Sequence, residues 1–353
     1  MSEKIKSGPG RTETRDTVLE VRNVEVTYEM GRGRARVLDD IDVAIERGET
    51  LGIVGESGSG KSMFASSLMH AVQDPGVLNG EIVYHPEDGD SVNLLDLSTR
   101  KLKAIRWEEI AIVYQGAMNA FNPTLTIGRH FTETFEAHDV DPDSGLERAR
   151  DIIKDLNLDP DRLLEAYSHE LSGGEKQRAL IALGLVFDPE VLILDEPTAA
   201  MDLLTQRYIL EMLYEIKEEY DLTLVFISHD MPIIAGFADR IAVMYSFEFV
   251  EFGNAREVLL QPEHPYTRLL LGATLDLETP LEATHTIEGS PPDPVNVPLG
   301  CSFAPRCPIS ADRCEAEDPE LRAEDTTHEV ACFFPNRSVE EIGINTADQR
   351  RRD

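Results

Sequence analysis

The chain contains 353 residues, enough for about two domains, and its 41% hydrophobic share is sufficient for a core of ordinary size. Its 66 aspartates and glutamates outnumber the 33 lysines and arginines, of which only eight are lysines, and the formal net charge is −33. A chain this acidic argues against a protein whose main task is to grip nucleic acid, because that task requires a cationic face.

The acidic residues are spread along segments with a folded pattern and do not form an acidic tail. This distribution is typical of a cytosol with very high salt, such as that of a halophilic archaeon, where charge screening is strong; an ordinary acidic protein is the alternative. Residues 1–17 lack the apolar run of a secretory signal. The sequence also contains no stretch of 18 apolar residues, which a bilayer-spanning helix would need. We expect residues 1–16 to be disordered and the protein to be soluble, or held at a membrane by a partner.

The chain begins with two predicted strands. Residues 18–28 alternate between apolar and polar side chains, residues 29–37 have the composition of a polar hairpin turn, and residues 38–49 form a second strand that ends at a glycine turn. Residues 50–72 then combine an apolar strand, a glycine-rich loop and a helix.

Helical and strand patterns follow one another through the middle of the chain. Apolar residues recur mostly at helical spacing from about residue 117 to residue 185. Short apolar runs rich in β-branched residues come next, at 191–196, 222–228 and 240–245. This order indicates an α/β fold in which a largely parallel sheet is buried on both faces.

The composition changes near the end of the chain. Prolines become frequent after about residue 261, so we place a boundary near residue 262 and an accessory extension at 263–335. Residues 336–353 are charged and are expected to form a flexible tail.

The segment GESGSGKS at 55–62 matches a phosphate-binding loop. Gly55, Gly58 and Gly60 allow the backbone to curl so that its N–H groups point at phosphate oxygens, and the helix that follows presents its positive end to the same anion. Lys61 is expected to reach the β- and γ-phosphates, and the Ser62 hydroxyl to bind Mg²⁺. A chance glycine loop is the alternative, but the strand before it and the helix after it favour the motif.

Two further segments carry chemistry that suits a nucleotide. The strand VLILDEPT ends in Asp195, placed to bind Mg²⁺ through water, and Glu196, placed to polarise the attacking water. The segment LSGGEKQR opens a helix with Ser172, Gly173 and Gly174, which also suits a phosphate. One complete phosphate loop and one additional phosphate site predict that each chain contacts nucleotide twice, the second time on another chain.

The order of these motifs resembles the ATP-binding subunits of ATP-binding-cassette (ABC) transporters over residues 18–335, nearly the whole chain. The matching features are Tyr28, the Walker A segment at 55–62, Gln115, the signature at 171–178, the Walker B segment at 191–198, Asp202 and His229. The resemblance implies a P-loop NTPase cassette at 17–262, with an N-terminal antiparallel β subdomain and an inserted helical subdomain at about 117–185. Within the match, AAMD at 199–202 stands where SALD is commoner.

The resemblance also implies roles for single residues. Tyr28 would stack on adenine, and Gln115 would touch Mg²⁺ and the attacking water. Ser172 and Gly174 would bind the γ-phosphate of the opposite subunit's ATP, while Asp202 organises the dimer interface. His229 would contact the γ-phosphate; the alternative is a structural histidine that caps the end of a strand. The expected nucleotide-binding set is completed by Ser57 and Ser59 of the loop segment and by Met63, the residue after it.

The implied reaction is hydrolysis of ATP with Mg²⁺. Water oriented by Glu196 and His229 would attack the γ-phosphate in line, while Mg²⁺, Lys61 and the loop amides absorb the developing charge. The helical subdomain would pass the resulting motion to membrane subunits. A regulatory subunit without hydrolysis is disfavoured, since both Glu196 and His229 are present.

The extension resembles the C-terminal region of oligopeptide and dipeptide importer ATPases in the segments HPYTRLLL (264–271), EGSPPDPVNVPLGCSFAPRCP (288–308) and RCEAEDPEL (313–321). Family members for nickel and oligosaccharides leave the cargo open. The implied partners are a second ATP-binding subunit, two transmembrane permeases and an extracellular solute-binding protein, with this chain at the cytoplasmic face of the membrane. A soluble cassette ATPase of DNA repair or ribosome function is a weaker alternative, because such chains typically carry two cassettes or a long coiled coil.

All four cysteines lie in one window, at Cys301, Cys307, Cys314 and Cys332. A disulfide is disfavoured in a reducing compartment, and the spacing lacks the paired C-x₂₋₄-C knuckles that are usual for zinc. Buried free thiols and zinc stay open as alternatives. A [4Fe–4S] cluster, which some members of this importer family carry at such cysteines, is the favoured interpretation and would help order a proline-rich extension too small to bury its own core.

Overall fold

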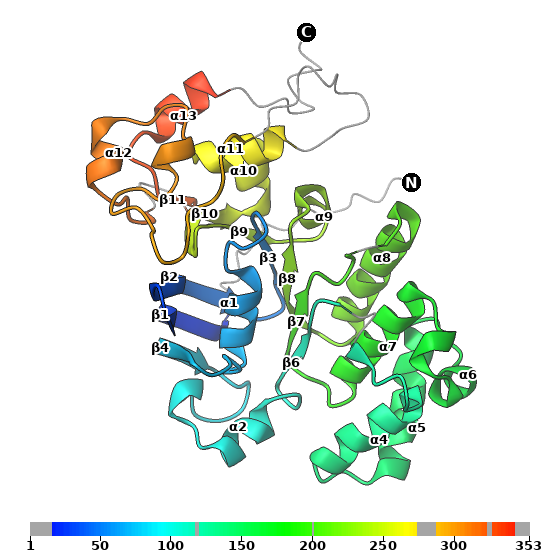
Figure 1. Cartoon of the computed structure of the whole chain (residues 1–353). Coiled ribbons are helices and arrows are strands. Elements are labelled where there is room, and N and C mark those ends of the chain that lie inside the picture. Colours follow the sequence, from blue (N-terminus) through cyan, green and yellow to red (C-terminus); the bar gives the residue numbers. More distant parts are fainter. Residues whose placement is uncertain (1–15, 117–119, 200, 274–286, 323–326, 343–353) are drawn as a thin grey trace, which may run out of the picture.

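The computed structural model describes residues 16–116, 120–199, 201–273, 287–322 and 327–342. Residues 1–15 and 343–353, which include most of the expected disordered N-terminus and of the expected tail, lie outside the described residues. Two sheets organise the molecule, with a group of helices on one side and the C-terminal extension at one end (Figure 1).

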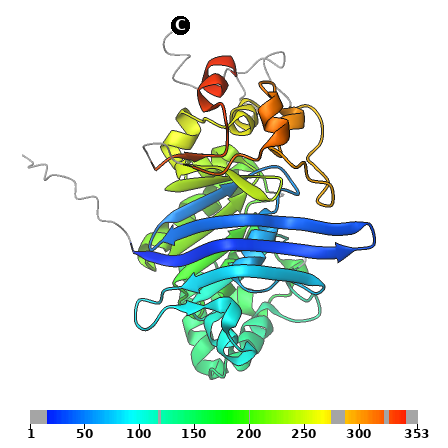
Figure 2. The same ribbon diagram turned by 90° about the vertical axis from the view of Figure 1, so that its left-hand side faces the viewer.

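The first sheet is antiparallel and built from long strands (Figure 2). Its strand order is β2 (Gly33–Glu46), β1 (Thr17–Met30), β4 (Gly76–Tyr84) and β5 (Val92–Asn93). The turn between β1 and β2 is much shorter than the polar composition of residues 29–37 indicates. Cross-strand pairs such as Tyr28 with Ala35 continue the ladder up to Met30 and Gly33, so only two residues remain for the turn.

The second sheet carries the parallel strands that the sequence predicts. Its order is β11 (Glu329–Val330), β10 (Glu248–Asn254), β9 (Arg240–Tyr245), β3 (Thr50–Val54), β8 (Thr223–Ser228), β7 (Val191–Asp195) and β6 (Ile110–Val113). The strands from β9 to β6 are parallel, whereas β10 and β11 continue the sheet in antiparallel pairs. The phosphate loop and the ends of β6, β7 and β8 therefore share one edge.

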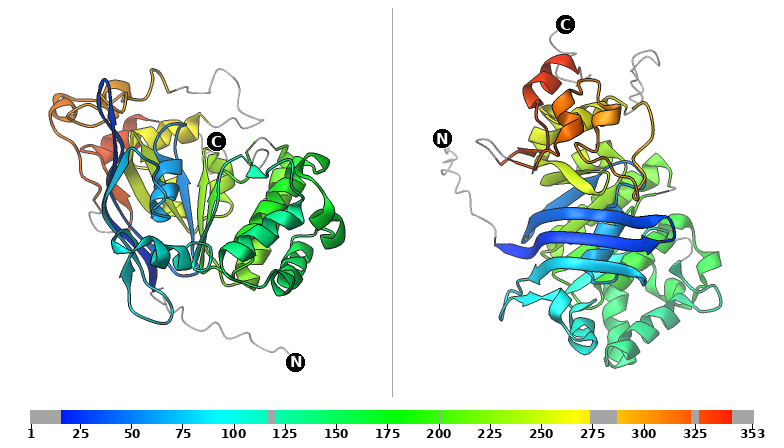
Figure 3. Two further views of the ribbon diagram at one scale, coloured as in Figure 1. Left: turned by 60° about the horizontal axis from the view of Figure 1, so that its bottom comes forward. Right: turned by 60° about the vertical axis from the view of Figure 1, so that its left-hand side comes forward.

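The helices of the described residues cover both faces of this sheet and extend beyond it (Figure 3). They are α1 (Lys61–Leu68), α2 (Thr99–Ile105), α4 (Ile127–Ala137), α5 (Pro142–Asp155), α6 (Pro160–Glu165), α7 (Gly173–Leu185), α8 (Leu203–Glu219), α9 (Met231–Ala235), α10 (Ala255–Leu260), α11 (Pro265–Gly272), α12 (Asp312–Ala316) and α13 (Pro335–Glu341), with short 3₁₀ turns η1 (Leu94–Asp96), η2 (Ser168–Glu170) and η4 (Ala304–Arg306).

The expected helical region contains α4 to α7, whose starts follow from local chemistry. Both α5 and α6 begin with a proline directly after an aspartate, and the carboxylates of Asp141 and Asp159 accept N–H groups of the first turn. Proline suits the first helical position because it lacks an N–H group that would otherwise need a partner.

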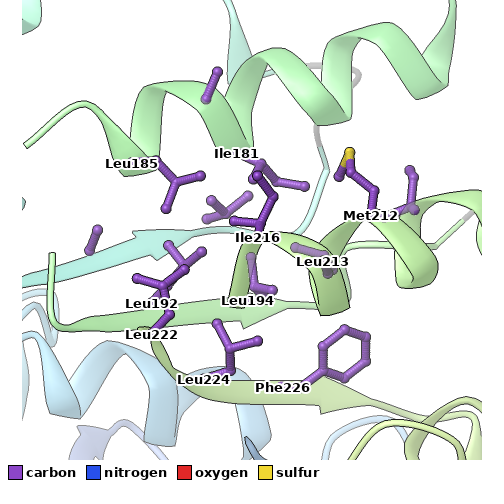
Figure 4. Close-up of a cluster of buried hydrophobic side chains, with 14 of the residues drawn as sticks. Ile181, Leu185, Leu192, Leu194, Met212, Leu213, Ile216, Leu222, Leu224 and Phe226 are labelled. Carbon is purple, nitrogen blue, oxygen red and sulfur yellow. The ribbon is translucent and has the colours of Figure 1, made fainter. Parts of the chain in front are cut away.

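Alternate residues of the parallel strands enter two different cores. Leu192 and Leu194 of β7 pack with α7 and α8, as Figure 4 shows, whereas Val191 and Ile193 face the core shared with α1 and the antiparallel sheet. Burial on both faces explains why these strands read as continuous apolar runs.

The C-terminal extension is attached to the cassette by a shared sheet edge and by buried polar contacts. Strand β11 pairs with β10, and the buried carboxylate of Glu251 accepts the Glu263 N–H at 2.6 Å and lies 2.9 Å from Nε2 of His328. Burial opposes protonation of His328, but its hydrogen bond to Glu251 and the carboxylate charge outweigh that effect, so the pKa of His328 is raised.

The first residues of the expected tail are helical. Helix α13 occupies 335–341, and the buried Arg268 of α11 donates from Nε to the Ile342 carbonyl at 2.7 Å. This contact caps the end of α13 and binds it to the extension.

An ion pair joins the two halves of the cassette. Glu49, whose side chain is 1% exposed, stands just before β3 and accepts two hydrogen bonds from Arg240 at the start of β9, at 2.8 and 2.6 Å. Arg240 also donates to the Ala44 carbonyl of β2 at 2.6 Å, so one guanidinium ties both sheets together.

We predict that Arg240→Met lowers the free energy of unfolding by about 2–4 kcal/mol, because it leaves the Glu49 carboxylate buried without its cation. Denaturant unfolding of the full chain measures the effect. Adding Glu49→Gln should recover much of the loss. The control is Arg22→Met, which breaks ion pairs with Glu20 and Glu81 at a half-exposed side chain and should cost no more than about 1 kcal/mol. Equal losses at both sites would contradict the prediction.

Candidate active site

The phosphate loop connects β3 to α1 and requires its glycines for steric reasons. A Cβ atom on Gly55 would stand 2.1 Å from the Met244 carbonyl oxygen, so a side chain there would collide with β9. Gly58 and Gly60 have φ angles of 83° and 112°, in the left-handed region that favours glycine. The loop thus closes tightly at the N-terminus of α1, as an anion-binding loop requires.

Lys61 is buried, and its ammonium group lies within the loop. Its Nζ donates hydrogen bonds to the carbonyls of Gly55 at 2.8 Å and Glu56 at 2.9 Å. Burial lowers the pKa of Lys61, against the negative charges of Glu196 and Asp195, which raise it. A buried ammonium group held at the loop, away from bulk water, can attract a polyanion strongly.

Asp195 ends β7 and pairs with Ser62, the first residue after Lys61. Burial raises the pKa of Asp195, while a hydrogen bond from the Ser62 hydroxyl lowers it. Oδ1 of Asp195 is buried and has no hydrogen-bond partner among the described residues. A buried carboxylate oxygen with spare lone pairs beside a hydroxyl is a fitting ligand set for Mg²⁺, which prefers oxygen donors and keeps several waters.

Three predicted site residues converge on one point beyond Asp195. The Glu196 carboxylate accepts a hydrogen bond from Nε2 of Gln115 at 3.2 Å and lies 2.9 Å from Nδ1 of His229. These residues follow β6, β7 and β8, which are adjacent parallel strands, so their side chains meet at the carboxyl edge of the sheet. The backbone of Glu196 has φ of 50°, an uncommon conformation for a non-glycine residue that turns the side chain out of the strand direction.

The side chains of His229 and Glu196 differ in their exposure to solvent, and the difference suits catalysis. The His229 side chain is 57% exposed and the Glu196 side chain only 10%. A sheltered carboxylate with an accessible imidazole beside it can orient a water molecule and then accept its proton.

The signature residues form a separate site on the same chain. Ser172 caps α7: its hydroxyl donates to Glu175 at 2.8 Å and accepts the Glu175 N–H at 3.3 Å. A hydrogen bond from Arg162 is the main cause that lowers the pKa of Glu175 to about 2. Gly174 leaves little room, since a Cβ there would lie 3.1 Å from Thr205, and Ser172, Gly174 and Asp202 line one shared pocket.

Asp202 is the N-cap of α8, and its carboxylate accepts hydrogen bonds from the N–H groups of Leu204 and Thr205 and from the Thr205 hydroxyl at 2.7 Å. The residues lining the signature pocket all belong to α7, α8 and the segments before them, and include none of the residues of the phosphate loop. The signature residues and the phosphate loop are therefore separate on the described chain, and the contact of one chain with two nucleotides stays a prediction.

Tyr28 and the remaining loop residues occupy varied surroundings. The Tyr28 ring is half-buried against Gly76 of β4, where a Cβ would stand 2.6 Å from Cζ of the ring. Ser57 is exposed, while the Ser59 hydroxyl is buried without a partner in the described part of the chain. Met63, in the first turn of α1, is partly buried against the core that lies between the parallel sheet and the antiparallel sheet. The proposed contacts of Tyr28 and Met63 with nucleotide stay predictions.

Sequence reasoning missed the surroundings of Glu56, a carboxylate inside a loop that binds anions. Arg306 and Tyr266, both from the extension, reach this residue. The signal in the sequence was the acidic residue within GESGSGKS, because a negative charge in an anion-binding loop is best tolerated beside a cation.

The four cysteines lie together in the extension. Cys301, Cys307, Cys314 and Cys332 line one small pocket with apolar residues around it. Burial raises the pKa of Cys301 to about 12 and those of Cys307 and Cys332 to about 11. Within residues 16–342, as far as they are described, no group of three or more histidine, cysteine or acidic side chains is arranged to hold a single metal ion.

No helix in the described residues is both long and apolar enough to cross a membrane.

Two family models match the chain. The model described as ABC transporter matches residues 38–199, which span the phosphate loop, the signature and β7. The model described as oligopeptide/dipeptide transporter, C-terminal region, matches residues 250–314, which include Tyr266, Arg306 and three of the cysteines.

Two transport ATP-binding proteins resemble the chain over nearly its whole length, and a solved cassette structure resembles two thirds of it. It is 37% identical to the dipeptide transport ATP-binding protein DppD of Caldanaerobacter subterraneus subsp. tengcongensis, over 90% of this chain and 97% of the relative. It is 35% identical to the oligopeptide transport ATP-binding protein OppD of Escherichia coli, over 93% and 95%. The dimeric structure of MJ0796, a bacterial ABC transporter cassette, superimposes with a TM-score of 0.58 at 28% identity, covering 67% of this chain and 99% of that one. The chain therefore belongs to the ATP-binding subunits of ABC transporters, in the oligopeptide/dipeptide importer family.

Proposed function

We propose that this chain hydrolyses ATP to drive the import of dipeptides or oligopeptides through a membrane transporter. The observation that carries the proposal is the meeting of Gln115, Glu196 and His229 at the sheet edge that also holds Lys61. The peptide cargo is supported by the names of the relatives and by the match of residues 250–314 to the C-terminal region of peptide transporters.

In the proposed reaction, ATP binds with its phosphates in the loop, and Lys61 neutralises the β- and γ-phosphates. Ser62 and Asp195 would hold Mg²⁺, which supplies positive charge to the phosphates. Glu196 takes a proton from the attacking water, while His229 and Gln115 hold that carboxylate in place. Most of the rate acceleration would then come from positioning and from charges fixed before the reaction.

A second ATP-binding subunit would complete the site. Ser172 and Gly174 lie in a half-site apart from the loop of the same chain, so their phosphate would come from a facing subunit. Leu203 and Leu204, at the start of α8 beside this half-site, are 80% and 81% exposed. Large apolar side chains this exposed beside a functional site are typical of a surface that another subunit covers.

We further propose that the chain lies at the cytoplasmic face of the membrane, bound to two permeases, and that an extracellular solute-binding protein delivers the peptide. The relatives named as transport ATP-binding proteins support this assembly. Purification from native membranes tests it: two multi-span proteins should accompany the chain. Ribosomes or DNA in their place would contradict it.

A [4Fe–4S] cluster in the extension is the second proposal. All four cysteines line one pocket, and three of their sulfurs accept backbone N–H groups, from Phe303 to Cys301, Ile309 to Cys307 and Phe334 to Cys332. Such hydrogen bonds favour thiolates, whereas burial in an apolar pocket disfavours them unless positive charge is bound.

The cluster proposal predicts that the full chain, purified without oxygen, contains about four iron atoms per molecule and absorbs visible light. Cys307→Ser should lose most of the iron. Ser302→Ala, a change of another buried residue in the same segment, should keep it. Zinc in stoichiometric amount, or iron at background in the unaltered chain, would contradict the proposal.

We also infer that the protein works in a high-salt cytosol, as the net charge of −33 and the scarcity of lysine suggest. The prediction is a melting temperature that continues to rise between about 0.5 and 2 M KCl. Simple screening cannot explain a rise in that range, because the Debye length is already only about 3 Å at 1 M. A melting temperature that levels off below this range would contradict the inference.

We predict that Glu196→Gln reduces kcat for ATP hydrolysis by about 10²–10⁴-fold while ATP still binds, because the amide cannot accept the proton of water. Phosphate release at saturating ATP measures hydrolysis, and size-exclusion chromatography should detect an ATP-dependent dimer that accumulates in the variant.

The matched control for this prediction is Glu211→Gln on the exposed face of α8, where the carboxylate pairs with Arg207 one turn earlier in the same helix. This variant should retain full activity. Undiminished hydrolysis in Glu196→Gln would remove Glu196 from the proposed role.

A further inference from the structure

Glu56 is a carboxylate in the middle of the phosphate loop, and each of its polar groups has a partner. Its carbonyl oxygen accepts hydrogen bonds from Lys61 Nζ at 2.9 Å and from the Ser59 N–H at 3.2 Å. Its own N–H donates to the Tyr266 hydroxyl at 2.8 Å, and its carboxylate binds Arg306. The first two partners belong to the loop and its helix, whereas the last two belong to the extension.

Arg306 binds the Glu56 carboxylate with both terminal nitrogens. The distances are 2.7 Å from Nη1 to Oε2 and 3.1 Å from Nη2 to Oε1, so the two groups form a bidentate pair across 250 residues of sequence. The Arg306 side chain is 5% exposed and that of Glu56 is 26% exposed. A sheltered pair of this geometry is strong and directional.

The guanidinium is itself fixed by the extension and by β9. Its Nε donates to the Glu288 carbonyl at 3.0 Å, and it lies over the Tyr245 ring with Cζ 5.7 Å from the centroid. Phe303 packs edge-on against the Tyr245 ring at a centroid distance of 5.1 Å, and the Tyr266 ring lies tilted against it at 4.6 Å. Arg306 therefore has little freedom to leave Glu56.

The charge of this pair bears directly on phosphate binding. A carboxylate in the loop repels the phosphates of ATP unless a cation neutralises it. Lys61 cannot serve this purpose, because its charge is needed by the phosphates themselves. Arg306 removes the repulsion, while Tyr266 fixes the backbone of the same residue. Both residues come from the region that follows the cassette in sequence.

We propose that Arg306 is a positioning residue for ATP binding, which neutralises Glu56 and holds the phosphate loop in its binding conformation from the C-terminal extension. The proposal rests on the function proposed above and adds that the extension is part of the ATP site. It does not depend on what the cysteines bind.

The test compares Arg306→Met, Glu56→Gln and the double variant in the full-length protein with its partners. Arg306→Met should raise KM for ATP by about tenfold with kcat within about twofold, because it leaves an unpaired carboxylate, that of Glu56, within the phosphate loop. Glu56→Gln alone should change KM by less than about threefold, and the double variant should return KM to within about threefold of the unaltered protein. Recovery on removing a second group distinguishes charge compensation from loss of a structural contact.

Arg322→Met is the control, since Arg322 lies in the same extension but pairs with Glu320 at a largely exposed site. It should leave KM unchanged. If Arg306→Met is too unstable for kinetics, the rise in melting temperature with ATP reports affinity, because the ligand stabilises only the folded chain. An unchanged KM in Arg306→Met, or a KM that stays raised in the double variant, overturns the proposal. Absence of hydrolysis in the unaltered complex would instead count against the proposed function.

Discussion

The requirement that organises this molecule is the binding of a highly charged anion at the carboxyl edge of a buried parallel sheet. Such an edge collects loop residues from adjacent strands, and the N-terminus of α1 supplies N–H groups to the same place. Lys61 provides the cation at this edge and is buried, which costs free energy unless negative charge is near. The strands β3, β8, β7 and β6 are adjacent for this reason as much as for their apolar packing, since their order brings His229, Glu196 and Gln115 beside the loop.

Negative charges around the site fall into three groups according to their partners. Glu56 is paired with a guanidinium, Glu196 is held by an amide and an imidazole, and Asp195 keeps a buried oxygen without a partner in the described chain. Pairing with the guanidinium neutralises Glu56, so that it does not repel phosphate. The contacts of Glu196 orient its carboxylate to accept a proton. The third is left for a cation, and its burial raises the pKa of Asp195.

The C-terminal extension is more closely integrated with the cassette than its composition indicates. Its strand β11 pairs with β10 at the edge of the second sheet. The buried carboxylate of Glu251 on β10 contacts His328 and the N–H of Glu263, both in the extension. Arg306 of the extension binds Glu56 in the phosphate loop. A region this rich in proline and short of apolar residues is stabilised by what it packs against. The same contacts allow a change in the extension to reach the nucleotide site.

The sequence alone predicted the α/β class, the phosphate loop and the two acids at the end of β7, because each depends on a short run of residues whose backbone and side-chain chemistry are local. Glycine at 55, 58 and 60 and the apolar run before Asp195 carry that information within a few positions. The residues that meet Glu56 could not be found in this way, since Tyr266 and Arg306 are separated from it by more than 200 residues and are recognisable only when β9, α11 and η4 have packed together. The same holds for the short turn between β1 and β2, whose extent was decided by the cross-strand register and not by the polar composition of residues 29–37. Charge balance is a property of the folded chain, because a buried carboxylate needs a cation from whichever segment the tertiary structure brings within reach.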